Sequence, residues 1–218
     1  MKTSMRYLIM SLATVALGLS FAPSPGGEED AASNKPKTVS KSGIPYLQDN
    51  DLAGPAELVN AIRARRTGGK LLNLDRILLH SPSFTRGWTS MFTAIRNQLS
   101  LSPKLRELAI MAIGVLNKSD YEYGQHEPEF LKAGGTMEQL GALADVPAAL
   151  DNTKLFDEAE RATLALTYEM TRNIIVSDAT MKRVRAILPD QQVVELAGTI
   201  AGYNMVSRFV VAIGIEME

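Results

Sequence analysis

The sequence predicts an all-α domain over residues 50–218, and three observations lead to this prediction. Apolar residues recur at helical spacing, as in the run from Phe84 to Leu99. Ser-Pro, Pro and Gly-Gly signals stand where helices would begin and end. No convincing alternating strand pattern appears, and the Gly-rich phosphate loops GxGxxG and GxxxxGK[ST] are missing.

Each expected helix has its own start and stop signals. Pro55 opens the first helix and Gly68-Gly69 follows it, as expected for Pro at the first turn and Gly past the last. Ser81-Pro82 ends a short second helix, and Ser83 is expected to cap a third that runs to about residue 99. Further helices are predicted at 103–116, 119–133, 136–144, 156–172, 178–188 and 189–215. The last is long and mostly apolar, so we expect it to be central or buried between subunits.

Residues 1–49 are expected to lie outside this domain. Lys2 and Arg6 precede an apolar run over 8–22, which is the pattern of a secretory signal. As a helix, that run would span about 22 Å, short of the roughly 30 Å hydrocarbon core of a membrane. We therefore predict a signal peptide over 1–22, export to the periplasm or medium, and no stable membrane span in the mature form. An uncleaved N-terminal anchor is the alternative. Residues 23–49 are predicted to be a disordered linker.

Composition excludes several kinds of chemistry. With 23 Lys and Arg against 24 Asp and Glu, the formal net charge is −1, which argues against nucleic acid as a partner. The chain has no cysteine, so thiolate nucleophiles, disulfides and Cys-ligated metal centres are excluded. Only two histidines are present, which disfavours a multi-histidine metal site within one subunit. We accordingly expect no cofactor and no metal.

The residues that could carry chemistry lie between Ser102 and Gly135. Glu107 interrupts an otherwise apolar helix, while Glu122 and His126, four residues apart, project from one face of the next. Two antiparallel helices joined by a short turn could bring Glu107 towards His126. A carboxylate beside an imidazole in a partly desolvated pocket makes a proton-transfer pair, because burial and neighbouring charge shift both pKa values.

This segment resembles the signature of the carboxymuconolactone decarboxylase and alkylhydroperoxidase D (AhpD-like) superfamily. The phrases LSPKLRELAIMAIGVLNKSDYEYGQHEPEFLKAGGT and AGYNMVSRFVVAIGIE carry the resemblance, which extends over roughly residues 74–215. It implies an all-α AhpD-like domain with orthogonal helix packing that assembles into a homotrimer or homohexamer.

The same resemblance separates two branches of activity. In the peroxidase branch a glutamate is followed by a CxxCxxxH motif, and Glu107 and His126 keep that spacing. Ser119 and Glu122, however, stand at the two cysteine positions. A thiol–disulfide cycle is therefore excluded. The remaining residues resemble the decarboxylase branch, which implies a cofactor-free lyase acting on a carboxylated unsaturated lactone or a similar small carboxylic acid.

In that interpretation the catalytic residues are Glu107, Glu122 and His126. His126 is expected to be the general acid that protonates carbon after carbon dioxide leaves, with Glu107 or Glu122 orienting it. Arg208 is the candidate for binding a substrate carboxylate, since arginine suits bidentate carboxylate recognition.

Each of these residues also has a structural explanation. Ser119 and Glu122 have the S-x-x-E spacing of a capping box, and Glu107 could pair with Lys104 or Arg106. Arg208 could form a structural or interface ion pair. The alternative function is a non-catalytic helical oligomer of the same fold that binds a small ligand or a partner.

Overall fold

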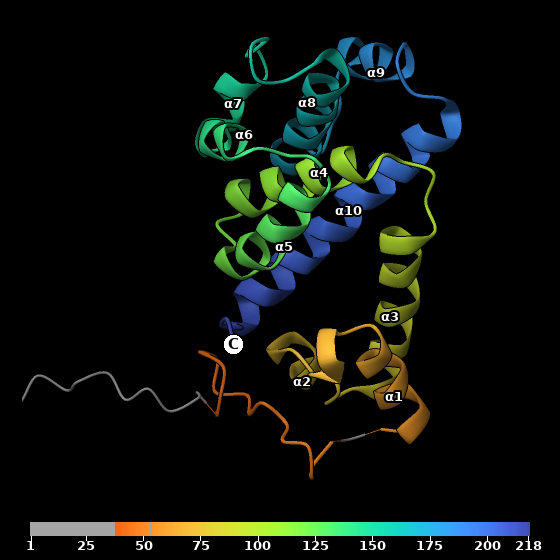
Figure 1. Cartoon of the computed structure of the whole chain (residues 1–218), viewed down its shortest axis with the longest axis vertical. Coiled ribbons are helices and arrows are strands. Elements are labelled where there is room, and N and C mark those ends of the chain that lie inside the picture. The colour runs from red at the N-terminus through yellow and green to blue at the C-terminus, as the bar shows by residue number, and fades with distance from the viewer. Residues whose placement is uncertain (1–37, 53) are drawn as a thin grey trace, which may run out of the picture. The chain divides into compact units, whose positions relative to one another are not determined.

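The computed structural model describes residues 38–52 and 54–218 (Figure 1). Over these residues the chain is helical, with one isolated β-bridge between Val39 and Pro45 and no sheet, which confirms the all-α prediction. The elements are α1 (Ala56–Ala64), η1 (Thr67–Gly69), α2 (Asn73–Leu78), α3 (Pro82–Asn97), α4 (Pro103–Leu116), α5 (Asp120–Lys132), α6 (Met137–Ala142), η2 (Leu143–Asp145), α7 (Val146–Ala149), α8 (Glu158–Arg172), α9 (Asp178–Arg185) and α10 (Asp190–Ile213).

Most helix boundaries follow the punctuation of the sequence. α3 begins at Pro82 rather than after Ser83, because proline at a first turn needs no N–H partner. The expected capping box at Thr136 is present: its hydroxyl accepts from the Gln139 N–H, and the Gln139 side chain accepts from the Thr136 N–H. The short helix α7 was not predicted, since four residues are too few to show a period.

The centre of the fold is α4. Its residues from Leu108 to Ile113 are all fully buried, so the helix is apolar on every side. It packs against α5, α8 and α10, and Figure 1 shows α10 running the length of this helical layer. Glu107 is therefore embedded in the most thoroughly buried helix of the described chain.

The apolar character of α10 has a packing explanation. By length and composition alone, this helix could cross a membrane, a test that the core helix of a soluble protein also passes. Leu196, Ile200 and Tyr203 are buried in the main core cluster, which matches the expectation of a central helix. Val194 and Val211 lie on its exposed side.

Part of the expected linker packs on the helical domain. Residues 1–37, which include the predicted signal peptide, lie outside the described residues. Residues 38–49, by contrast, contain two buried side chains, Ser40 and Tyr46. Tyr46 joins the main core, and its hydroxyl accepts a hydrogen bond from the Glu216 N–H at 3.1 Å. A buried aromatic ring with a satisfied hydroxyl orders this segment, so the prediction of disorder does not hold for these residues.

The space around Gly135, which follows α5, predicts how a larger residue there would change stability. A Cβ at Gly135 would overlap the ring of Phe130, which is fully buried. We expect Gly135→Ala to lower the free energy of unfolding by about 1–3 kcal/mol through overpacking. Gly141→Ala is the matched control, because a Cβ there meets open space. Urea denaturation of both variants checks this, and equal stability of the two would contradict the packing explanation.

Candidate active site

The α4–α5 hairpin brings together two of the residues predicted to form the site. Glu107 lies on α4 and His126 on α5, and the connecting turn passes through Lys118 with a positive φ of 55°. His126 Nδ1 lies 2.8 Å from Glu107 Oε2, and both side chains are buried. The juxtaposition expected from the sequence is therefore present in the structure.

The Glu107 carboxylate is held from two sides. Arg106 Nε donates to its Oε1 at 3.0 Å, in addition to the bond with His126 at Oε2. Burial by itself raises the pKa of Glu107, but the bond with His126 and the charge of Arg106 outweigh it and leave the pKa below its ordinary value. Glu107 is thus an anion at neutral pH, and the bond to Arg106 is one of its expected structural partners.

His126 is correspondingly neutral and has a defined tautomer. Burial lowers the pKa of His126, Glu107 opposes this, and the net direction is downward. A carboxylate can only accept hydrogen bonds, so Nδ1 carries the proton and Nε2 carries the lone pair. Among the described residues, Nε2 has no hydrogen-bond partner. The imidazole is therefore a base whose reactive nitrogen is unoccupied.

Glu122 does not form the capping box that its spacing allowed. The N-cap residue Ser119 makes no side-chain cap hydrogen bond, and its hydroxyl is buried without a partner. Both carboxyl oxygens of Glu122 are also buried without a hydrogen-bond partner in the described chain. Ser207, the hydroxyl nearby, already donates to the Tyr203 carbonyl and accepts from Asn117. The structural explanation for Glu122 is thereby removed.

A buried carboxyl without partners is stable only in its neutral form. Burial raises the pKa of Glu122 well above its ordinary value, and the Ser207 hydroxyl offsets this only in part. The raised pKa of Glu122 favours its protonated form, whereas the lowered pKa of His126, one helical turn along α5, favours the neutral base. The two residues form an acid and a base on the same helix face.

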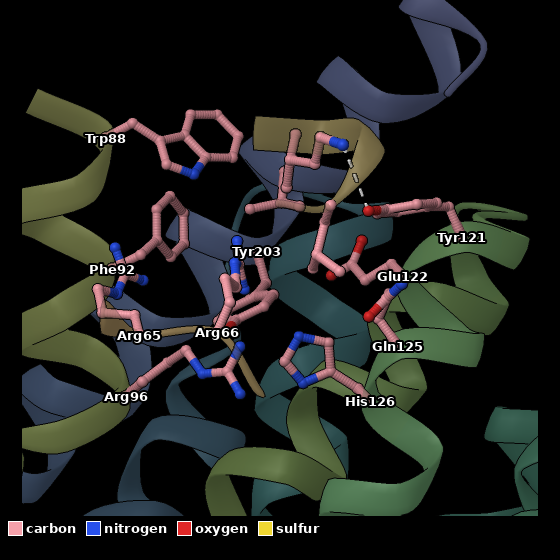
Figure 2. A pocket seen from close by; sticks show the side chains of 13 residues that line it. Arg65, Arg66, Trp88, Phe92, Arg96, Tyr121, Glu122, Gln125, His126 and Tyr203 are labelled. Carbon is pink, nitrogen blue, oxygen red and sulfur yellow. Dashed lines mark hydrogen bonds between the residues drawn. The ribbon is translucent and has the colours of Figure 1, made fainter. Parts of the chain in front are cut away.

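A cavity of about 60 Å³ lies against this face of α5. Figure 2 shows Glu122, Gln125 and His126 on one side, and on the other the two arginines that follow α1 and the arginine in the last turn of α3. The remaining lining is aromatic and apolar: Trp88, Phe92, Tyr121, Tyr203, Leu72, Leu74 and Val206. The Tyr203 ring meets the His126 ring edge-on, with centroids 5.0 Å apart. The cavity is thus a small, mainly apolar hollow with acid, base and cationic groups in its wall.

The arginines that line the cavity are not the one expected from the sequence. Arg208 is exposed, donates to the carbonyl and side-chain oxygens of Asn204, and does not line the cavity. Arg65, Arg66 and Arg96 do line it. Basic residues at helix C-termini are ordinary partners of the helix dipole, so nothing in their local sequence distinguishes these three.

The raised pKa of Glu122 predicts how the stability of the folded protein changes with pH. Because its pKa is raised on folding, the folded state binds one more proton than the unfolded state above the unfolded-state pKa of about 4.3. The contribution of this group to the free energy of unfolding is complete below that pH. As the pH rises further, the contribution is lost at about 1.4 kcal/mol per pH unit until the pKa of the folded state is reached. Glu122→Gln should abolish this loss.

Urea denaturation of wild type and variant across pH 4–8 measures the difference. Glu127→Gln, also on α5 and without a hydrogen bond in the described chain, should retain the wild-type slope. Parallel curves for wild type and Glu122→Gln would show that the carboxyl is ionised in the fold.

Part of the chain is similar to a known protein family. Residues 82–168 match the model of the carboxymuconolactone decarboxylase family, a range that contains Glu107, Glu122 and His126. No curated protein sequence matches the chain.

Solved structures resemble the fold at low identity. An uncharacterised peroxidase-related protein from Silicibacter sp. TM1040 has 18% identity and a TM-score of 0.68, covering 85% of this chain and 95% of its own. An AhpD-core peroxidase-related protein from Ralstonia eutropha JMP134 has 18% identity and a TM-score of 0.64, with coverages of 75% and 86%. A cysteine-to-alanine variant of the debrominase Bmp8, in complex with 2,3,4-tribromopyrrole, has 14% identity and a TM-score of 0.66, with coverages of 85% and 93%. The match over residues 82–168 shows that this segment is similar to the carboxymuconolactone decarboxylase family, and the solved structures show that the cysteine-less chain has an AhpD-like helical fold.

Proposed function

We propose that the protein is a cofactor-free carboxy-lyase that decarboxylates a carboxylated unsaturated lactone or a similar small carboxylic acid. The observation that carries this proposal is that Glu122 and His126 line the same cavity. Glu122 is buried without a hydrogen-bond partner, and His126 is hydrogen-bonded to Glu107. The family match over residues 82–168 supports the reaction class. The absence of cysteine leaves no group for a thiol peroxidase cycle.

The reaction needs a proton donor more than it needs a base. The bond between the ring carbon and the leaving carboxylate breaks, carbon dioxide departs, and the electron pair passes through the conjugated system to the lactone carbonyl. The resulting dienolate is then protonated on carbon. A neutral carboxyl in a desolvated site is suited to that step, because it holds its proton at neutral pH and releases it only to a strong base.

This assigns Glu122 as the general acid and revises the expected division of roles. His126 was expected to donate the proton, but at neutral pH its Nε2 carries a lone pair instead. We assign His126 to take a proton from water and to pass it to the Glu122 carboxylate after each turnover, and the hydroxide that remains combines with the released carbon dioxide as bicarbonate. Glu107 is the positioning residue of His126. Glu107 fixes the tautomer through the 2.8 Å bond to Nδ1.

At 14% identity, the likeness to the debrominase Bmp8 concerns the fold alone.

Substitution of the acid tests the proposal. Glu122→Gln preserves shape and removes the transferable proton, so carbon dioxide release from carboxymuconolactone should fall by about 10²–10⁴-fold. Carbon dioxide release by His126→Ala should also fall steeply, because Glu122 would no longer be reprotonated after each turnover. Glu127→Gln, on the same helix but outside the cavity lining, is the matched control and should retain wild-type turnover.

Two results would count against the proposal. Full turnover by Glu122→Gln would remove Glu122 as the acid. Absence of carbon dioxide release from wild type, with retained ligand binding, would favour the non-catalytic alternative. Organic hydroperoxide should give no thiol-dependent turnover in either case.

A further inference from the structure

Tyr203, on α10, lines the same cavity as Glu122 and His126 of α5. Its ring meets the His126 ring edge-on, with centroids 5.0 Å apart, and packs edge-on against Phe92 at 5.4 Å. Figure 2 shows Tyr203 between Phe92 and the side chains of α5. The residue is only 2% exposed, so its ring is a buried part of the cavity wall beside the proposed base.

The hydroxyl of Tyr203 has no partner in the fold. It makes no hydrogen bond within the described chain. In that part of the chain, the sealed side-chain oxygens without a partner belong to Ser119, Glu122 and Thr163, and the Tyr203 oxygen is not among them. An unpartnered hydroxyl that is not sealed, on a residue that lines the cavity, is open to that cavity. Packing explains the ring, whereas no contact within the described residues explains the hydroxyl, which costs free energy to remove from water.

Other neutral donors in the cavity wall are engaged or lie farther from the base. The Tyr121 hydroxyl accepts from a backbone N–H at 3.4 Å and donates to Glu218 Oε1 at 3.2 Å. Trp88, whose indole N–H has no hydrogen bond within the described chain, lies at the opposite end of the cavity from His126 in Figure 2. The Tyr203 hydroxyl is therefore a free donor on a ring that contacts His126 directly.

The Tyr203 hydroxyl keeps its proton and so acts as a donor. Burial raises its pKa, and although the charge of Arg96 acts in the opposite direction, the net shift is upward. The charges of Glu107 and Glu122 raise it further. A neutral phenol in a desolvated site donates only a modest hydrogen bond to a neutral carbonyl. The bond becomes stronger as negative charge develops on that oxygen.

We propose that Tyr203 is a further catalytic residue, whose hydroxyl donates a hydrogen bond to the substrate carbonyl oxygen that becomes negatively charged in the reaction. When the bond to the leaving carboxylate breaks, carbon dioxide departs and the electron pair passes through the conjugated system to this oxygen. Tyr203 keeps its proton, and Glu122 then protonates carbon as the carbonyl is restored. This role rests on the proposed decarboxylation, whereas donation to a ligand oxyanion can be measured without turnover.

Binding of 4-nitrophenolate tests the donor directly. This probe is a planar, conjugated oxyanion, and 4-nitroanisole is its uncharged counterpart of similar shape. Calorimetry uses the full chain at a mildly alkaline pH at which the probe is ionised. Tyr203→Phe should bind the phenolate about tenfold or more weakly than wild type, which is the loss of one charge-assisted hydrogen bond. Both proteins should bind 4-nitroanisole equally well.

Turnover provides a second measurement. Tyr203→Phe should lower kcat for carbon dioxide release by about 10²–10³-fold with KM little changed, because the hydrogen bond strengthens only as charge develops. A purely structural residue would not separate kcat from KM in this way. Tyr168→Phe, on α8 and outside the cavity lining, is the matched control and should behave as wild type in both measurements.

Urea denaturation should show Tyr203→Phe to be as stable as wild type, since the hydroxyl has no partner in the described chain. A clear loss of stability would reveal a structural role and overturn the proposal. Undiminished phenolate binding by Tyr203→Phe, or no phenolate binding by wild type at millimolar concentration, would also overturn it.

The outcome is separable from that of the proposed function. Tyrosine-dependent phenolate binding without carbon dioxide release by wild type would leave the hydrogen-bond donor standing and remove the decarboxylase. Carbon dioxide release by wild type, together with an unchanged kcat in Tyr203→Phe, would remove the role of Tyr203 alone.

Discussion

The hydrogen bond between His126 Nδ1 and Glu107 Oε2 joins the two helices that define the site. It lies in the α4–α5 hairpin, and both of its side chains are buried. A buried carboxylate is costly unless it is paired, and here an imidazole N–H and the Arg106 guanidinium both pair with it. The same bond fixes the imidazole tautomer, so a structural requirement of the core also determines which nitrogen faces the cavity.

Glu122 differs from Glu107 although both are buried glutamates. Glu107 has two hydrogen-bond donors and a lowered pKa, whereas Glu122 has no hydrogen-bond partner and a raised pKa. The difference arises from the neighbours that the fold provides, since the side chains are chemically identical. Two carboxyl groups whose pKa values are shifted in opposite directions, one of them hydrogen-bonded to an imidazole, are groups suited to acid–base chemistry.

The two walls of the cavity also differ in charge. One wall presents guanidinium groups at the C-terminal ends of α1 and α3, and the other presents Glu122 and His126 of α5. Aromatic rings also line the cavity, and an environment of low polarity strengthens electrostatic interactions. The C-terminal end of α1 precedes residue 82, where the family match begins, so a segment before that match also lines the cavity.

Local patterns along the chain were enough to predict the helical class, most helix boundaries and the Glu107–His126 pair. These features follow from periodicity, capping residues and a short turn, all of which act within a few residues of one another. The unpartnered state of Glu122 and the positions of Arg65, Arg96 and Arg208 emerged only from the packing of the helices. Spacing allowed a capping box at Ser119 and a carboxylate anchor at Arg208, but packing left the first unmade and placed the second outside the cavity. Burial and charge at a residue depend on elements distant in sequence, here α1 and α3 against α5, and no local pattern encodes that proximity.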